Sequence, residues 1–253
     1  MRKLGKLLLI LVVLCAVALG IAAVRNGGDV AGTLKNLSGS ISQTLGARKR
    51  ASADGLPEVD LNSWALKLVN RDHPLSENFT VDTGVSEDGY LFDSRAVSAL
   101  DAMLDAGRAE GLQLTLTSAY RTRDYQAMLF ENKVSEVMQS TGLGREEAED
   151  EAATVVARPG TSEHELGLAA DIVCEYYGIL DDGYADTPEA KWLEAHCAQY
   201  GFILRYAGEK EDITGVIYEP WHFRYVGEPA AEYIMGHGLC LEEFVEKLEA
   251  RGA

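Results

Sequence analysis

The sequence predicts a domain that combines α-helices with β-strands, and two patterns indicate this mixture. Residues 112–117 alternate leucine with polar side chains, which is typical of a strand with one buried face. Residues 93–110 place apolar side chains three and four positions apart, which is typical of a helix that covers a core. Hydrophobic residues make up 47% of the 253-residue chain, so it is long and apolar enough to bury a core.

The first 24 residues are expected to form a transmembrane anchor. Three basic residues precede an uncharged apolar run over residues 7–24, about the minimum length of a membrane span. The basic residues predict a cytoplasmic N-terminus, a single pass through the cell membrane, and a C-terminal domain outside the cytoplasm. A cleaved signal peptide is the alternative, because Ala-Val-Ala at residues 16–18 offers a cleavage site. The domain would then be secreted.

Residues 25–57 are expected to form a flexible linker, because this stretch is rich in Gly, Ser, Asn and Ala. The folded domain then covers residues 58–253. The net charge of −17 argues against nucleic-acid binding, since contacts with phosphates need a basic face. No feature of the sequence points to an obligate protein partner.

Cysteine usage limits the disulfides of the exported domain. Cys15 lies in the apolar N-terminal run, so Cys174, Cys197 and Cys240 remain, which is enough for at most one intramolecular bond. Cys174 and Cys197 are the preferred pair, and buried free thiols are the alternative. The spacing is not that of a cysteine-based zinc site.

The elements of the domain follow from periodicity and from turn-forming residues. Residues 64–69 alternate as a strand or extended segment, and Asp93 is placed to cap the helix that ends before Gly111. The other expected helices cover residues 123–141, 145–155, 188–200, 229–236 and 241–251. The other expected strands cover residues 168–173, 202–206 and 222–226.

Two segments supply the residue types of a catalytic zinc site. His164 and Asp171 lie in the first segment, and Glu219 and His222 lie in the second. Two imidazoles and one carboxylate are three protein ligands, and they leave zinc an open position for water. Gly167 permits a tight reversal of the chain between the first two ligands. We expect His222 to lie beside Asp171 on a neighbouring strand.

Glu219 is the candidate general base, because it precedes His222 by three residues. It would take a proton from a zinc-bound water that attacks the substrate amide and hand it to the leaving amine. Arg121 follows a strand and leads into a helix, so it is a candidate for binding a carboxylate or an oxyanion. The alternative for Arg121 is a surface salt bridge with Asp124 or Glu131. The alternative for each histidine is a hydrogen-bonded position in the core.

These segments resemble the VanY-type D-alanyl-D-alanine carboxypeptidases, a zinc D,D-peptidase family that also includes the VanX dipeptidases. The resemblance rests on Ser162-x-His164-x-x-Gly167-x-Ala169-x-Asp171, followed by Glu219-x-x-His222. Segments 68–75, 118–122, 200–206 and 211–225 are also similar to the family.

The resemblance implies a small α+β domain with a central antiparallel sheet and helices packed around it. It implies Zn2+ as the cofactor, held by His164, Asp171 and His222. It also implies Glu219 as the base and Arg121 as the residue that contacts the substrate or the intermediate. The positions similar to substrate-lining residues of the family are Ser118, Gln126 and Ser162.

The resemblance and the expected export together predict a zinc-dependent carboxypeptidase that removes the terminal D-Ala from peptidoglycan stem peptides. Its expected partners are a stem peptide ending in D-Ala-D-Ala and the membrane. A D,D-dipeptidase or a peptidoglycan endopeptidase with the same metal site is one alternative, because the sequence does not show the depth of the pocket. A non-catalytic cell-wall-binding module is another, and the base beside the metal argues against it.

Overall fold

The computed structural model describes residues 55–252. The chain divides into two units, Met1–Gly55 and Leu56–Ala253, and the second contains every element named below. The predicted anchor over residues 1–24 lies outside the described residues, as does nearly all of the predicted linker over residues 25–57. Within residues 55–252, no helix is both long and apolar enough to cross a bilayer.

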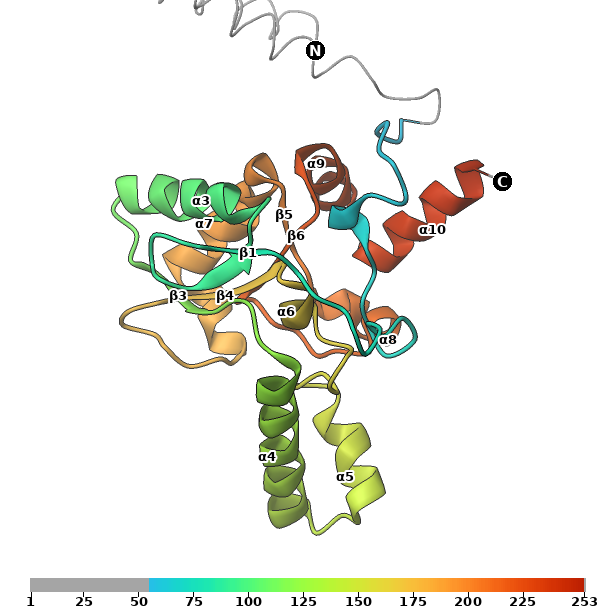
Figure 1. The fold of residues 1–253 in the computed structure, drawn as a ribbon. Coiled ribbons are helices and arrows are strands. Elements are labelled where there is room, and N and C mark those ends of the chain that lie inside the picture. Colours follow the sequence, from blue (N-terminus) through green and yellow to red (C-terminus); the bar gives the residue numbers. More distant parts are fainter. Residues whose placement is uncertain (1–54, 253) are drawn as a thin grey trace, which may run out of the picture. The chain divides into compact units, whose positions relative to one another are not determined.

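A four-stranded antiparallel sheet forms the centre of the domain, in the order β3-β4-β6-β5 (Figure 1). Its strands are β3 (Leu114–Ser118), β4 (Ala169–Cys174), β5 (Phe202–Leu204) and β6 (His222–Tyr225). A separate antiparallel hairpin consists of β1 (Thr83–Val85) and β2 (Leu91–Asp93). The antiparallel pairing and the surrounding helices confirm the α+β class.

The helices begin and end largely where capping residues predict. Thr122 Oγ1 accepts a hydrogen bond from the Tyr125 amide at the start of α4, and Gly142 closes that helix in a left-handed conformation. Thr187 caps α7 in the same way. The α-helices are α3 (Val97–Ala109), α4 (Arg123–Thr141), α5 (Arg145–Ala152), α6 (Glu163–Leu166), α7 (Pro188–His196), α8 (Glu211–Thr214), α9 (Glu228–His237) and α10 (Leu241–Gly252). The 3-10 helices are η1 (Trp64–Leu66), η2 (Asp182–Asp186), η3 (Cys197–Tyr200) and η4 (Gly208–Lys210).

The two faces of the central sheet have different roles. Ala170, Ile172 and Phe223 point to the face that α3 and α7 cover, where they join the main apolar core. Asp171 and His222 alternate with these residues along β4 and β6, so they point to the opposite face. One face of the sheet therefore belongs to the main core, and the other carries the polar side chains of Asp171 and His222 beside smaller apolar clusters.

The helices α4 and α5 pack side by side and extend away from the sheet (Figure 1). Phe130 and Val134 of α4 join Ala148 and Ala152 of α5 in a small apolar cluster of their own. The rest of α5 is exposed and acidic, which agrees with the thin apolar stripe of its sequence.

Two local expectations are wrong. Asp93 does not cap α3, because it ends β2 and pairs with Thr83 of β1, so the helix begins only after Ala96. The carboxylate of Asp93 instead accepts hydrogen bonds from Arg95. Residues 64–69 contain the 3-10 helix η1 and no strand.

The preferred disulfide does not form. Cys174, Cys197 and Cys240 are all buried free thiols. Cys174 packs in an apolar cluster with Tyr184 and Trp221, whereas Cys197 belongs to the main core. The alternative expectation of buried free thiols is therefore confirmed.

Candidate metal and catalytic site

A single helical turn positions His164. α6 begins after Ser162, whose side chain accepts a hydrogen bond from the His164 amide, and it ends at Gly167. Gly167 has a φ of +80°, a left-handed conformation that other residues rarely adopt. A Cβ atom there would also lie 3.3 Å from Val81 Cγ1. The predicted reversal at Gly167 is thus confirmed, and it leads the chain from His164 directly into β4.

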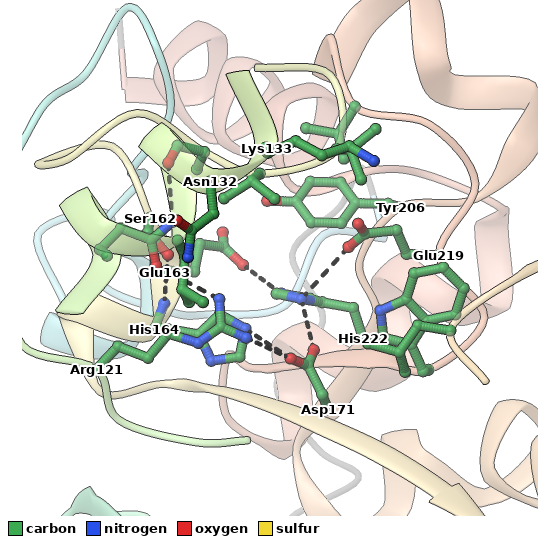
Figure 2. A pocket seen from close by; sticks show the side chains of 18 of the residues that line it. Arg121, Asn132, Lys133, Ser162, Glu163, His164, Asp171, Tyr206, Glu219 and His222 are labelled. Atoms are coloured by element: carbon green, nitrogen blue, oxygen red, sulfur yellow. Dashed lines mark hydrogen bonds and ion pairs between the residues drawn. The ribbon is translucent and has the colours of Figure 1, made fainter. Parts of the chain in front are cut away.

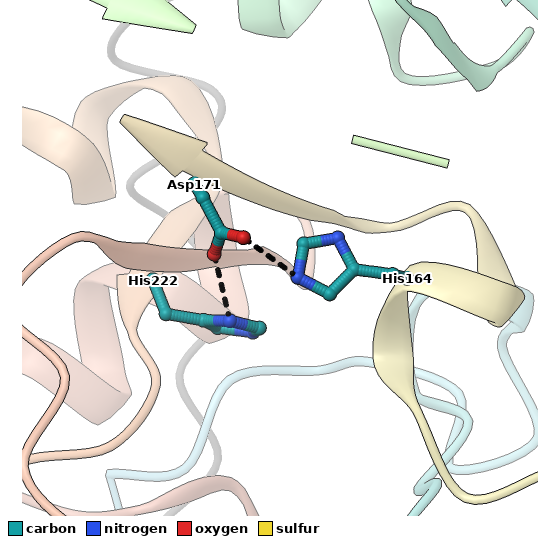
Figure 3. Close-up of side chains that lie close together, drawn as sticks. All are labelled: His164, Asp171 and His222. Atoms are coloured by element: carbon teal, nitrogen blue, oxygen red, sulfur yellow. Dashed lines mark ion pairs between the residues drawn. The ribbon is translucent and has the colours of Figure 1, made fainter. Parts of the chain in front are cut away.

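Neighbouring strands position the other two predicted ligands. Asp171 on β4 and His222 on β6 are directly opposed in the antiparallel register, as expected. His222 Nδ1 lies 3.1 Å from Asp171 Oδ1, and His164 Nε2 lies 3.2 Å from Asp171 Oδ2 (Figure 3). The two imidazole rings are nearly perpendicular, with centroids 5.0 Å apart. The three side chains therefore converge on one point.

This group has the properties of a metal-binding site. One ligand atom from each of His164, Asp171 and His222 lies within 4.8 Å of the others, and all three residues are buried. His164 Nδ1 donates a hydrogen bond to the Ala119 carbonyl at 2.7 Å, so the lone pair on Nε2 faces the group. Asp171 Oδ1 is buried without a hydrogen-bond partner. Two imidazole nitrogens and a carboxylate oxygen form a donor set that suits zinc.

Glu219 stands beside this group, on the segment that leads into β6. Its Oε2 lies 3.6 Å from His222 Nδ1, and its amide donates to the Tyr206 carbonyl at 3.0 Å (Figure 2). Burial raises the pKa of Glu219 to about 8. A carboxyl group that titrates near neutral pH beside the predicted metal ligands is suited to general acid–base catalysis.

Burial and charge move the pKa values of the two histidines apart. Burial, together with the nearby Arg121, lowers the pKa of His164 to about 4. Burial also acts to lower the pKa of His222, but the adjacent carboxylates of Asp171 and Glu163 outweigh it and raise the pKa to about 9. Burial acts to raise the pKa of Asp171, but its imidazole partners hold it well below the usual range. Asp171 is therefore a carboxylate and His164 a neutral imidazole, as metal ligation requires.

Arg121 points into the site and not to the surface. Its Nη2 lies 2.7 Å from Asp171 Oδ2, and its Nε donates to Ser118 Oγ at 2.8 Å. A third contact joins Nη1 to Gln126 Oε1 at 3.4 Å. The alternative expectation of a surface salt bridge with an acidic residue of α4 is therefore wrong. The guanidinium instead places a positive charge at the edge of the metal-binding group.

The three residues implied to line the substrate site lie close to this group. Ser162 and Gln126 line a cavity of about 360 Å³ that includes the metal-binding group. Ser118 is opposite Asp171, because a β-bulge in β3 shifts the register between the two strands. Ser118 therefore reaches the site through its hydrogen bond with Arg121.

The site also contains residues that the sequence did not single out. Asn132 and Lys133 of α4 line the cavity, as does Tyr206 (Figure 2). Glu163 is almost fully buried, and its Oε2 faces the His222 ring. Sequence patterns alone do not mark these positions, although Glu163 and Tyr206 fall within segments that resemble the VanY family.

An α+β domain with a buried His-Asp-His group and a neighbouring glutamate has the arrangement of a metallohydrolase. Comparisons with known proteins agree with this class. The family model of VanY, D-alanyl-D-alanine carboxypeptidase, matches residues 90–228. The D-alanyl-D-alanine carboxypeptidase of Enterococcus faecalis is 41% identical over 186 residues, which cover 74% of this chain and 67% of that relative.

Two solved structures are similar over most of the chain. A mutant of the vancomycin-resistance D,D-pentapeptidase VanY in complex with Zn(II) is 41% identical with a TM-score of 0.65, covering 72% of this chain and 99% of that chain. The LD-carboxypeptidase LdcB is 36% identical with a TM-score of 0.64, covering 78% of this chain and 92% of that chain.

The chain belongs to the VanY family of D-alanyl-D-alanine carboxypeptidases, and it is therefore a peptidase. The resemblance seen in the sequence is thus confirmed. The expected zinc cofactor is confirmed by Zn(II) in the related VanY structure, together with the His-Asp-His group of this chain.

Proposed function

We propose that this protein removes the terminal D-alanine from peptidoglycan stem peptides that end in D-Ala-D-Ala. One observation carries the proposal: His164, Asp171 and His222 form a buried metal-binding group beside Glu219, within a single cavity. Membership of the VanY family supports the choice of substrate.

The proposed reaction is hydrolysis of the amide between the two D-alanines. Zinc held by the three ligands would lower the pKa of a bound water towards neutrality and polarise the scissile carbonyl. Glu219 takes a proton from the attacking water as its oxygen bonds to the carbonyl carbon. The C–N bond then breaks, and Glu219 delivers the proton to the amine of the departing D-alanine.

Arg121 is proposed to stabilise the negative charge of the tetrahedral intermediate or to hold the terminal carboxylate of the substrate. Its guanidinium lies 2.7 Å from Asp171, and it is oriented by Ser118 and Gln126. A planar guanidinium can form two parallel hydrogen bonds with a carboxylate, which suits recognition of a free peptide terminus.

The lining of the cavity supports a carboxypeptidase over a D,D-dipeptidase. Besides the metal-binding group, the cavity is lined by Leu129, Asn132 and Lys133 of α4 and by Val155 and Leu180. We propose that peptide residues on the N-terminal side of the cleaved bond lie against these side chains. A dipeptide has no such residues, so a dipeptidase would leave this part of the cavity unused.

A second candidate is an LD-carboxypeptidase activity, which the similarity to LdcB favours. Such an activity would release D-alanine from a peptide whose penultimate residue has the L configuration. The metal-binding group and Glu219 would perform the same chemistry in both cases. The walls of the cavity, rather than the metal site, would then decide between the two substrates.

We also propose that the domain works outside the cytoplasm, either tethered by residues 1–24 or released after their cleavage. The basic residues before the apolar run support this orientation. Protease added to intact protoplasts should therefore digest the domain while a cytoplasmic marker survives. Protection of the domain in that experiment would contradict an extracytoplasmic location.

Comparison of three peptides tests the proposed substrate. D-alanine release by the purified protein is measured with a pentapeptide ending in D-Ala-D-Ala, a tetrapeptide ending in an L-residue and D-Ala, and the free dipeptide D-Ala-D-Ala. The pentapeptide should have the highest kcat/KM. A higher value for the tetrapeptide would establish the second candidate, and a higher value for the dipeptide would establish a dipeptidase. Release from none of the three would refute the proposal.

A further inference from the structure

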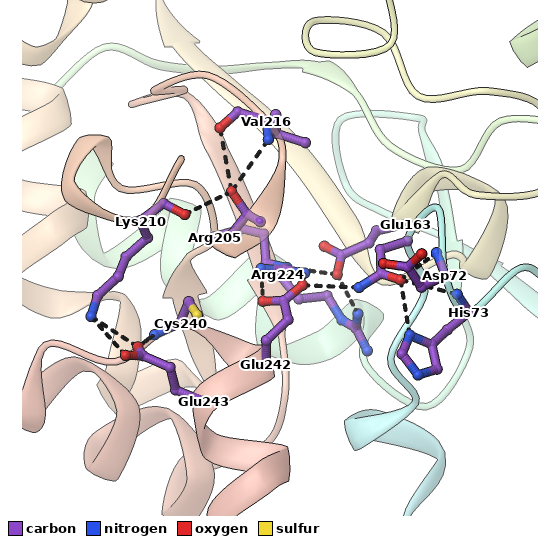
Figure 4. Close-up of polar contacts among 12 residues, drawn as sticks. Asp72, His73, Glu163, Arg205, Lys210, Val216, Arg224, Cys240, Glu242 and Glu243 are labelled. Atoms are coloured by element: carbon purple, nitrogen blue, oxygen red, sulfur yellow. Dashed lines mark hydrogen bonds and ion pairs between the residues drawn. The ribbon is translucent and has the colours of Figure 1, made fainter. Parts of the chain in front are cut away.

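A buried carboxylate lies at the Nε2 edge of the His222 ring, whereas the metal-binding group faces the Nδ1 edge. Glu163 Oε1 accepts hydrogen bonds from Arg205 Nε at 2.7 Å and from Arg224 Nη1 at 2.8 Å (Figure 4). The side chains of Glu163, Arg205 and Arg224 are all 0% exposed. Two charge-assisted hydrogen bonds therefore fix the position of the Glu163 carboxylate and keep it ionised.

The second oxygen of this carboxylate is directed at His222. Glu163 Oε2 lies 3.5 Å from His222 Nε2. Both atoms are buried, and apart from this contact neither has a polar partner within hydrogen-bond distance among the described residues. A carboxylate oxygen can only accept, so the contact is favourable when Nε2 carries a proton.

We propose that Glu163 is a positioning residue that keeps a proton on His222 Nε2 and thereby turns the Nδ1 lone pair towards the metal. This inference rests on the metal site of the proposed function. A neutral imidazole with its proton on one nitrogen offers a lone pair only at the other. A carboxylate behind a ligating histidine also orients the ring and raises the basicity of the ligand nitrogen.

The other imidazole is held by the backbone. His164 Nδ1 donates to the Ala119 carbonyl, so the Nε2 atom faces the metal-binding group. The two histidines therefore present different nitrogens to Asp171, Nε2 from His164 at 3.2 Å and Nδ1 from His222 at 3.1 Å. Only His222 depends on a carboxylate side chain for this orientation.

The arginines that hold Glu163 are themselves anchored away from the site. Arg224 Nη2 donates to two backbone carbonyls in the segment around η1. Arg205 forms two hydrogen bonds with the carboxylate of Glu242 at the start of α10, at 2.9 Å and 2.6 Å. Because these contacts keep both arginines on Oε1 of Glu163, the Oε2 atom is left to face His222.

Replacement of Glu163 by glutamine separates positioning from packing. The arginines can only donate, so in Glu163→Gln the amide oxygen stays with them and the amide NH2 group faces His222 Nε2. The glutamine NH2 group then faces an N–H at His222 Nε2, and two donors cannot hydrogen-bond with each other. The imidazole therefore shifts to the tautomer that carries its proton on Nδ1. Zinc affinity, measured by competition with a chromogenic chelator, should fall about 10- to 100-fold.

Glu165→Gln is the matched control. Glu165 is a buried carboxylate on the same helical turn, but it accepts from the Gly160 amide and pairs with Arg123. Since it contacts no metal ligand, its replacement should leave the zinc affinity within about twofold. Equal zinc affinities in Glu163→Gln and Glu165→Gln would overturn the proposal.

The unsubstituted protein provides a second test that depends neither on a variant nor on peptidase activity. With NMR-active cadmium in the site and isotope-labelled histidine, scalar coupling identifies the nitrogen that binds the metal. Cadmium should couple to Nδ1 of His222, and the ring proton should reside on Nε2. Coupling to Nε2 would overturn the positioning role but leave the metal site intact. Failure to bind any metal would refute both the proposed function and this inference.

Discussion

Replacement of Glu219 by glutamine tests the acid–base step selectively. Glutamine keeps the shape of the side chain but removes a carboxylate whose Oε2 lies 3.6 Å from His222 Nδ1. Removal of a positioned general base lowers rates by about 10²–10⁴, so kcat should fall by this factor. The corresponding increase in activation free energy is about 2.7–5.4 kcal/mol. Because Glu219 is outside the His-Asp-His group, the protein should retain its zinc.

The assay measures D-alanine release from the pentapeptide, and the zinc content of each protein is determined alongside. Glu165→Gln is the matched control, because its carboxylate is buried but contacts Gly160 and Arg123 and does not line the cavity. This control should keep both zinc and turnover. A Glu219→Gln protein with bound zinc and full turnover would refute the assignment of the base. Loss of zinc from that variant would instead identify Glu219 as a ligand.

Three further predictions concern the protonation of the site, its positive charge and the thiols. Burial opposes a proton on His222, yet the adjacent carboxylates of Asp171 and Glu163 raise the pKa of its imidazole to about 9. A metal that binds Nδ1 must therefore displace a proton. Zinc affinity should therefore rise between about pH 7 and pH 9, by up to tenfold per pH unit. A zinc affinity that does not change with pH would contradict this expectation. Arg121→Lys keeps the positive charge but loses the planar guanidinium that can form two parallel hydrogen bonds, so kcat/KM should fall by about 10²–10³. An unchanged kcat/KM would exclude a role of Arg121 in charge stabilisation. Thiol titration of the denatured, unreduced domain should find the three free cysteines of the fold, and a single thiol would show that a disulfide forms in solution.

The centre of the site could be predicted from the sequence because local patterns mark its elements clearly. Gly167 signals the reversal after His164, and its left-handed backbone confirms that signal. Apolar residues around Asp171 indicate a buried strand, and His222 opens another strand. Once these two strands pair, the ligands lie side by side.

The surroundings of the site could not be predicted, because they depend on contacts between distant segments. Arg205 and Arg224 are residue types that are usually exposed, and their complete burial follows from pairing with Glu163. Arg121 is only 17% exposed, and it turns inward because its partner Asp171 lies on β4. Cysteine count likewise limits the number of disulfides but says nothing about which thiols meet in space.

We expect a zinc ion bound by His164, Asp171 and His222 to drive the release of D-alanine. The most direct measurement combines zinc analysis of the purified protein with D-alanine release from the pentapeptide before and after removal of the metal by a chelator. We expect one zinc site per chain, loss of activity in the chelator, and recovery when Zn2+ is restored. Activity that persists in the metal-free protein, or full zinc occupancy without D-alanine release, would contradict this expectation.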